Sequence, residues 1–208
     1  MGVCLCFSFS GNAFTGYVFC LFLLRLRIRE SLVSGKMQKE DLDMESQQNL
    51  SLRLGELLRQ HKLVMTTAES CTGGGVSAAI TDIAGSSAWF DRAFITYSNE
   101  AKMEMLGVQA ATLEAYGAVS EPTVKEMVLG ALENSRASIG VSISGIAGPG
   151  GGTDDKPVGT VCFAWADEKG WLHVSTYQFG GDREQVRQQA VYTAQQVLVE
   201  KLLGHSEL

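Results

Sequence analysis

The stretch LVMTTAESCTGGGVSAAI, residues 63–80, decides the fold class of this chain. Its apolar and β-branched beginning, Leu63 to Thr67, predicts a buried strand, and the run that follows the glycines predicts a helix from Gly74 onward. A strand that enters a helix through small residues leaves backbone N–H groups unpaired, and these can bind an anion or a developing oxyanion. Ser70 in this turn is therefore a candidate nucleophile, although serine is equally an ordinary residue at a helix start.

The rest of the chain alternates predicted strands with predicted helices. Further strands are expected at residues 93–97, 139–144, 160–166 and 172–179, and helices at residues 45–61, 74–83, 99–105, 121–134 and 183–203. This alternation favours a single-domain, three-layer α/β sandwich, which a chain of 208 residues is long enough to form. The last two strands are expected to form a hairpin, so the predicted sheet is mixed and mostly parallel.

Three hydroxyl-bearing residues, Ser70, Tyr97 and Ser144, each fall at the exit of a predicted strand. In open α/β sheets, ligands bind at the carboxyl ends of the parallel strands, where the loops converge. We therefore expect these residues to share one site.

Composition excludes several classes of function. The formal net charge of −6 and the lack of a basic run in the body of the chain argue against a nucleic-acid or anionic-membrane surface. The cysteines form no CxxC pair and the histidines lack ligand spacing, which predicts a cytoplasmic protein with no disulfide framework and no zinc site. The cysteines are Cys4, Cys6, Cys20, Cys71 and Cys162, and the histidines are His61, His173 and His205.

Residues 1–36 differ in character from the rest. The chain carries no charge from Gly2 to Leu24, and arginines follow at 25, 27 and 29. Polar interruptions make this segment a poor membrane-spanning helix, and basic residues after the apolar run are the reverse of a secretory signal. We expect residues 1–36 to be a non-functional N-terminal extension from a mis-set start, with a weak membrane anchor as the alternative.

A serine nucleophile needs a base, and no histidine follows in a triad-like setting. Lys102 is the remaining candidate, because a lysine against apolar surface can give up its proton near neutral pH; a solvent-facing helix lysine is the alternative. Tyr97 could bond to the Lys–Ser pair, line the pocket for a ring, or be an ordinary aromatic residue at a strand end. Cys71 lacks the His or Asn partner that would mark an activated thiol.

A second glycine-rich loop covers residues 145–153. It is not a P-loop, because Gly151 and Gly152 replace the Lys and Ser/Thr that contact phosphate and magnesium, and Thr153 breaks the Rossmann pattern. Such a loop can approach a ligand closely; a flexible surface loop is the alternative. Arg183 and Arg187 lie four residues apart at the start of the last predicted helix and could grip a phosphate, or could form surface salt bridges.

Three segments, AESCTGG (residues 68–74), TYSNEAK (96–102) and SGIAGPGGGTDDKPVGTV (144–161), resemble the CinA C-terminal domain family, the nicotinamide mononucleotide deamidases. The resemblance covers about residues 45–203. It implies hydrolysis of the carboxamide of nicotinamide mononucleotide to nicotinate mononucleotide and ammonia, which recycles pyridine nucleotides toward NAD. In the family, Ser70 corresponds to the nucleophile and Lys102 to its base. Tyr97 is our further candidate for a catalytic residue.

The residues expected to contact the substrate are Thr72, Gly73, Gly74, Asn99, Ser144, Gly145, Gly148, Gly150, Arg183 and Arg187. Ser144 stands where the family usually has Thr. No metal or cofactor is expected. The expected partner is the small-molecule substrate, and neither nucleic-acid binding nor stable membrane association is expected. The sequence is compatible with a homo-oligomer. Two alternatives remain: a catalytically silent nucleotide-binding paralogue linked to competence or DNA damage, and an amidase for another small amide.

Overall fold

The computed structural model describes the backbone of residues 39–204 and the side chains of residues 47–204. The contacts divide the chain after Leu42, and the fold lies in the unit Asp43–Leu208. The expected N-terminal extension, residues 1–36, lies outside the described residues, so its role stays a prediction. Among residues 39–204, no helix combines the length and the apolar character that a bilayer crossing requires.

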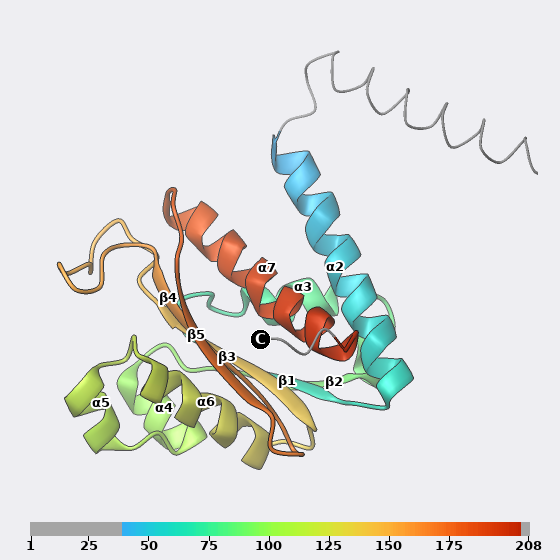
Figure 1. Cartoon of the computed structure of the whole chain (residues 1–208), viewed down its shortest axis with the longest axis horizontal. Coiled ribbons are helices and arrows are strands. Elements are labelled where there is room, and N and C mark those ends of the chain that lie inside the picture. Colours follow the sequence, from blue (N-terminus) through green and yellow to red (C-terminus); the bar gives the residue numbers. More distant parts are fainter. Residues whose placement is uncertain (1–38, 205–208) are drawn as a thin grey trace, which may run out of the picture. The chain divides into compact units, whose positions relative to one another are not determined.

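The centre of the fold is one five-stranded sheet in the order β2-β1-β3-β4-β5 (Figure 1). The strands are β1 (Met65–Glu69), β2 (Phe90–Ile95), β3 (Ile139–Gly145), β4 (Thr160–Asp167) and β5 (Leu172–Gln178). The pairs of β1 with β2 and with β3 are parallel, whereas β4 is antiparallel to both of its neighbours. The predicted mixed sheet, with most strands in one direction and a closing hairpin, is confirmed.

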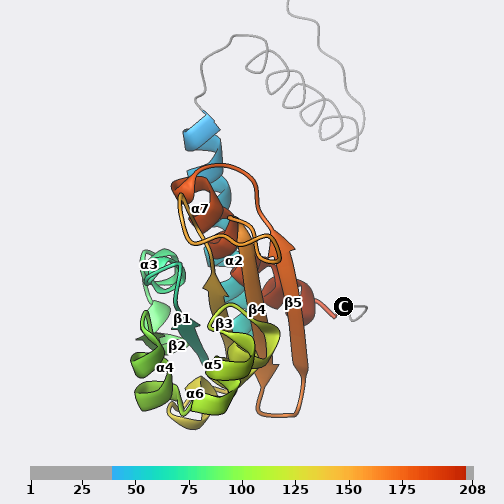
Figure 2. The same cartoon turned by 90° about the vertical axis from the view of Figure 1, so that its left-hand side faces the viewer.

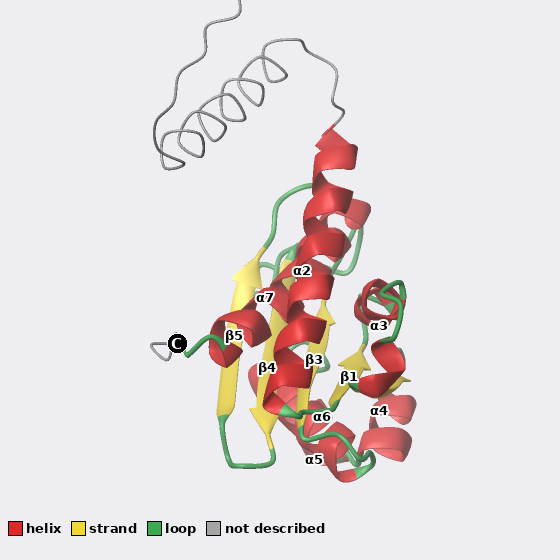
Figure 3. Cartoon of the chain, turned by 90° about the vertical axis from the view of Figure 1, so that its right-hand side faces the viewer, coloured by secondary structure: helices red, strands yellow, loops and turns green. Residues whose placement is uncertain are grey.

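Helices cover both faces of the sheet (Figures 2 and 3). One apolar cluster joins the sheet to the leucines of α2 and to α3 and α7, and a second cluster joins the opposite face to α4 and α6. This is the predicted three-layer sandwich. The helices are α2 (Lys39–His61), α3 (Gly75–Thr81), α4 (Asn99–Leu106), α5 (Ala110–Tyr116), α6 (Glu121–Glu133) and α7 (Arg183–Leu202).

Side chains alternate between these two clusters along β1. Met65 lies in the cluster with α2, α3 and α7, and Ala68 lies in the cluster with α4 and α6. Because successive strand residues point to opposite faces, Glu69 points toward α3 and Ser70 toward α4. This alternation places the side chains of Glu69 and Ser70 on opposite faces of the sheet at the exit of β1.

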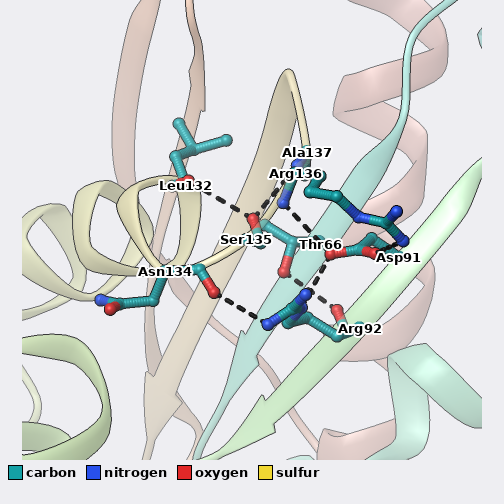
Figure 4. Close-up of polar contacts among 8 residues, drawn as sticks. All are labelled: Thr66, Asp91, Arg92, Leu132, Asn134, Ser135, Arg136 and Ala137. Carbon is teal, nitrogen blue, oxygen red and sulfur yellow. Dashed lines mark hydrogen bonds and ion pairs between the residues drawn. The ribbon is translucent and has the colours of Figure 1, made fainter.

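A polar cluster lies at the other end of these parallel strands, where β2 begins and where the chain enters β3 (Figure 4). The Asp91 carboxylate accepts hydrogen bonds from Arg136 Nη2 at 2.9 Å, from the Arg136 backbone N–H at 3.2 Å and from Arg92 Nε at 2.7 Å. Arg92 also donates to the Asn134 carbonyl at 3.1 Å. The cluster therefore ties β2 to the connection between α6 and β3.

Candidate active site

The exits of the three parallel strands bring the predicted site residues together. Ser70 directly follows β1, and its N–H donates to the Ile143 carbonyl of β3 at 2.9 Å. On the other side, the Thr96 N–H donates to the Glu69 carbonyl at 2.8 Å, which places Tyr97 next to the same strand end. Ser144 is buried near the end of β3. The structure places Ser70, Tyr97 and Ser144 at adjacent strand exits, and that they share one binding site stays a prediction.

The amine of Lys102 lies against the hydroxyl of Ser70. Lys102 Nζ is 3.1 Å from Ser70 Oγ and donates a second hydrogen bond of 2.8 Å to the Thr96 carbonyl. Both side chains are shielded, with Lys102 1% exposed and Ser70 9% exposed. Lys102 reaches this position because the first turn of α4, capped by Ser98, packs its buried face onto the sheet. The predicted nucleophile and base are thus in direct contact.

Burial lowers the pKa of Lys102 below its usual value, because the apolar surroundings disfavour the charged amine. Among the described residues, no carboxylate forms an ion pair with Lys102. A neutral amine carries a lone pair that can accept the hydroxyl proton of Ser70. The environment therefore favours the protonation state that a general base requires.

Cys71, the neighbour of Ser70, has the opposite chemistry. Its side chain is buried, and burial raises the pKa of the thiol to about 12. At neutral pH the thiol therefore stays protonated and is a poor nucleophile. The structure favours Ser70 over Cys71 for this reason.

The turn after Ser70 differs from the sequence expectation in one respect. The N–H groups around residues 71–74 were expected to face a bound anion, but several are already committed within the protein. The Gly73 N–H donates to the Ser70 carbonyl at 3.0 Å, and the Gly74 N–H donates to the Glu69 carboxylate at 3.0 Å. Of residues 71–74, only Cys71 and Thr72 have N–H groups that donate to no oxygen of the described residues, and both lie near the Cys71 sulfur, whose pKa they act to lower.

Glu69 lies next to Ser70 at the same strand exit and was not predicted from the sequence. Its side chain is 0% exposed, and its carboxylate fills the start of α3. A charged residue at the end of an otherwise apolar strand, five residues before a glycine-led helix, was the available signal.

Two arginines of α7 reach the loops around Ser70. Arg183 Nη1 donates to the Gly148 carbonyl at 2.8 Å, and its Nη2 lies 3.4 Å from the Tyr97 hydroxyl. Arg187 Nη2 donates to the Thr72 carbonyl at 2.8 Å, while its Nε is buried without a partner in the described part of the chain. The predicted arginine pair thus joins the strand exits and the second glycine loop at one place.

The Tyr97 hydroxyl contacts Arg183 and neither Ser70 nor Lys102. Its side chain is 64% exposed. Tyr97 was predicted either to bond to the Lys–Ser pair or to line a pocket for a ring. Its position favours the second role.

At two positions of the second loop, close packing explains why the residue is glycine. A Cβ at Gly145 would lie 2.7 Å from Val161 Cγ2, and one at Gly148, where φ is +83°, would lie 2.6 Å from Val158 Cγ1. Gly150 and Asn99 are exposed, and no contact of the described residues links either of them to Ser70. Their predicted role in substrate binding stays a prediction.

Within the described residues, no group of three or more His, Cys, Asp and Glu side chains is arranged to hold a metal ion.

Comparison with known proteins places this arrangement in a family. The CinA C-terminal domain family matches residues 47–202. The chain belongs to this family. The nicotinamide-nucleotide amidohydrolase PncC of Escherichia coli (strain K12) is 55% identical over 157 residues, which cover 76% of this chain and 95% of that protein. The protein of the same name from Pseudomonas putida is 50% identical over 145 residues, with 70% of this chain and 90% of that protein covered.

Solved structures of CinA-family proteins share the fold. The competence/damage inducible protein CihA from Agrobacterium tumefaciens superimposes with a TM-score of 0.74 at 43% identity, over 76% of this chain and 96% of that one. A CinA superfamily protein from Klebsiella pneumoniae gives a TM-score of 0.73 at 43% identity, over 76% of this chain and 98% of that one. The family and the fold class predicted from the sequence are both confirmed.

Proposed function

We propose that this amidohydrolase of the CinA family converts nicotinamide mononucleotide to nicotinate mononucleotide and ammonia by a serine–lysine mechanism. The observation that carries the proposal is the contact of 3.1 Å between Lys102 Nζ and Ser70 Oγ in a shielded site at the strand exits. The names of the PncC relatives support the substrate class.

In the first half of the proposed reaction, neutral Lys102 accepts the hydroxyl proton of Ser70 while Oγ attacks the carboxamide carbon. The carbonyl π pair moves onto oxygen, which becomes the oxyanion of a tetrahedral intermediate. The Ser70 N–H cannot stabilise this oxyanion because it donates to Ile143 in the sheet. The N–H groups of Cys71 and Thr72 are the remaining donors in this turn, and we assign them to the oxyanion.

In the second half, protonated Lys102 gives its proton to the leaving nitrogen. The C–N bond breaks, ammonia departs and an ester forms on Ser70. Water then attacks the ester carbon as Lys102 accepts one water proton, and the C–O bond to Ser70 breaks to give the carboxylic acid, which loses its remaining proton to the solvent. The returning proton restores the Ser70 hydroxyl, so one water is consumed for each ammonia released.

Arg183 and Arg187 are proposed to bind the 5′-phosphate of the mononucleotide. Each guanidinium uses only part of its donors on backbone carbonyls, and the buried Nε of Arg187 has no partner among the described residues. Arginine binds phosphate through parallel N–H bonds, so these unused donors suit the substrate. We further propose that the enzyme acts in the cytoplasm, in the recycling of pyridine nucleotides toward NAD.

The test is ammonia release by the purified full chain from nicotinamide mononucleotide, compared with nicotinamide and with NAD, and with Ser70→Ala as the blank. Release from the mononucleotide alone supports the proposal. Binding of the mononucleotide without release would identify a silent paralogue. Faster release from free nicotinamide would identify an amidase for another amide.

A further inference from the structure

The Glu69 carboxylate collects the hydrogen bonds of the turn that follows the nucleophile. One oxygen accepts from the Ser77 N–H at 2.9 Å and from Thr67 Oγ1 at 3.2 Å. The other oxygen accepts from Thr72 Oγ1 at 2.7 Å, from the Gly74 N–H at 3.0 Å and from the Val76 N–H at 3.1 Å. All five donors are neutral, and the side chain is fully buried.

A buried carboxylate is unfavourable unless its oxygens are hydrogen-bonded, and bonds to an ionised acceptor are about twice as strong as neutral ones. The arrangement at Glu69 therefore makes the turn rigid. It also occupies the first-turn N–H groups of α3, so an external phosphate cannot bind there. The N–H groups of Cys71 and Thr72, which donate to no oxygen of the described residues, are the donors of this turn that Glu69 does not engage.

Thr72 is held from two directions. Its hydroxyl donates to Glu69 at 2.7 Å, and its carbonyl accepts from Arg187 Nη2 at 2.8 Å. The Gly75 N–H also donates to this carbonyl at 3.1 Å. These bonds hold the Thr72 side chain and the peptide unit that follows it, and so restrict the orientation of the Thr72 N–H. An oxyanion donor works only when it is already aimed at the position that the oxyanion takes.

We propose that Glu69 is a positioning residue that aims the N–H groups of Cys71 and Thr72 at the oxyanion, from the face of the sheet opposite to Lys102. This inference rests on the proposed function for the identity of the reaction. It assigns to Glu69 an effect on the transition state and none on the binding of the substrate.

The experiment compares Glu69→Gln and Thr72→Val with the wild-type chain. An amide cannot accept at both ends, so Glu69→Gln breaks one of the two sets of bonds, and Thr72→Val removes a single bond at nearly constant volume. We expect kcat per folded molecule to fall at least about tenfold in each, since loss of one oxyanion donor lowers kcat about 10²–10³-fold, with KM within about threefold. Thr72→Ser, which restores the hydroxyl, should recover at least about fivefold of the loss in Thr72→Val.

The matched control is Ser51→Ala. Ser51 Oγ donates to Gln195 Oε1 at 2.7 Å in the fully buried contact of α2 with α7, far from the strand exits. This variant loses a buried hydrogen bond of the same length as that of Thr72 and should melt at a lower temperature with an unchanged kcat. A loss of kcat in step with melting temperature across all variants would reduce Glu69 to a structural role and overturn the inference.

A second readout does not depend on the natural substrate. The rate at which a fluorophosphonate labels Ser70, followed by intact-protein mass spectrometry, also depends on donors to a developing P–O⁻. Slower labelling of Glu69→Gln, in a chain that releases no ammonia from the mononucleotide, would support Glu69 and overturn the proposed function. Normal labelling and normal kcat in Glu69→Gln would overturn the inference and leave the proposed function standing. A wild-type chain that neither labels nor releases ammonia would overturn both.

Discussion

Lys102 Nζ and Ser70 Oγ meet at 3.1 Å although 32 residues separate them in the chain. The contact forms because α4 follows the edge strand β2 in the chain and packs its buried face on the sheet. Lys102 lies on that buried face and reaches the exit of β1. The amine rests on a backbone carbonyl and a hydroxyl, and no described carboxylate pairs with it. In the proposed reaction, this amine is the base that accepts the Ser70 proton.

The first prediction concerns the pH dependence of the reaction. Because burial lowers the pKa of Lys102, the rate should rise with pH through an apparent pKa below the usual lysine value of 10.5. Lys102→Arg keeps the charge but cannot give up its proton, and it should be nearly as inactive as Lys102→Ala. Initial rates over a pH series decide this. Near-normal turnover in Lys102→Arg with an unchanged profile would mean that the residue acts by charge alone.

The same burial predicts an effect on stability. In acid, both the folded and the unfolded chain carry a protonated Lys102, and the folded state bears the full desolvation penalty. As pH rises from the lowered folded pKa toward 10.5, this penalty disappears, so stability should increase over that window. Lys102→Met should therefore melt above the wild type in mild acid, with a gap that closes as the pH is raised. Scanning calorimetry at several pH values measures the gap, and a constant gap would contradict the prediction.

The second residue pair to test is Ser70 and Cys71. Ser70→Ala should fold normally and lose at least about a thousandfold in kcat, because the covalent step is lost. Cys71→Ala should stay within about tenfold, because only the backbone N–H of residue 71 enters the mechanism. Steady-state assays of both variants test the assignment. It fails if the cysteine variant is inactive while the serine variant is not.

The two arginines should differ in their kinetic effects. Arg183→Ala should chiefly raise KM, because its proposed phosphate contact is remote from the reacting carbon. Arg187→Ala should raise KM and lower kcat as well, because Arg187 also holds the Thr72 carbonyl. Nicotinamide riboside, which lacks the phosphate, should be a poor substrate for the wild type and should respond little to Arg183→Ala. Equal efficiency on riboside and mononucleotide would remove the phosphate role.

Asp91 should affect how the stability of the fold depends on pH in acid and should leave kcat unchanged. The hydrogen bonds from Arg136 and Arg92 lower the pKa of Asp91 from its ordinary 3.8 to about 2. Its stabilising contribution is therefore present above the unfolded pKa and is lost as the pH falls toward 2. Asp91→Asn should lower the melting temperature at neutral pH, by about 2–4 °C per kcal/mol lost, and the difference should close in acid. Its kcat should equal that of the wild type, since the cluster lies at the opposite end of the strands.

The sequence predicted the sheet, its two layers of helices and the strand exits, because periodicity and turn residues mark these features locally. The first strand was placed two residues too early. Leu63 instead ends the preceding helix by donating its N–H to the Leu58 carbonyl at 2.9 Å, and Lys62 adopts a φ of +56°. Helix α5 was missed, because a seven-residue helix without a buried residue carries no apolar stripe.

The candidate site could be predicted only in part. Ser70 and Lys102 were found through their chemistry and through a resemblance, but the contact between them depends on how α4 packs. The hydrogen bonds of Glu69 could not be predicted, because most of its partners are backbone N–H groups and these leave no pattern of side chains in the sequence. The capping interactions at Ser120 and Asp182, in contrast, were predictable, because donor and acceptor lie three residues apart.

The alternation of side chains along β1 limits how the gene for this protein can vary. A deletion or insertion of one codon within the strand would turn the carboxylate, in place of the hydroxyl, toward Lys102. The resulting ion pair would keep the amine protonated and give it nothing to activate. Under the proposed mechanism, a one-residue length change in this strand that no bulge absorbs would therefore abolish activity, whereas the loops at the far end of the sheet are free of that constraint.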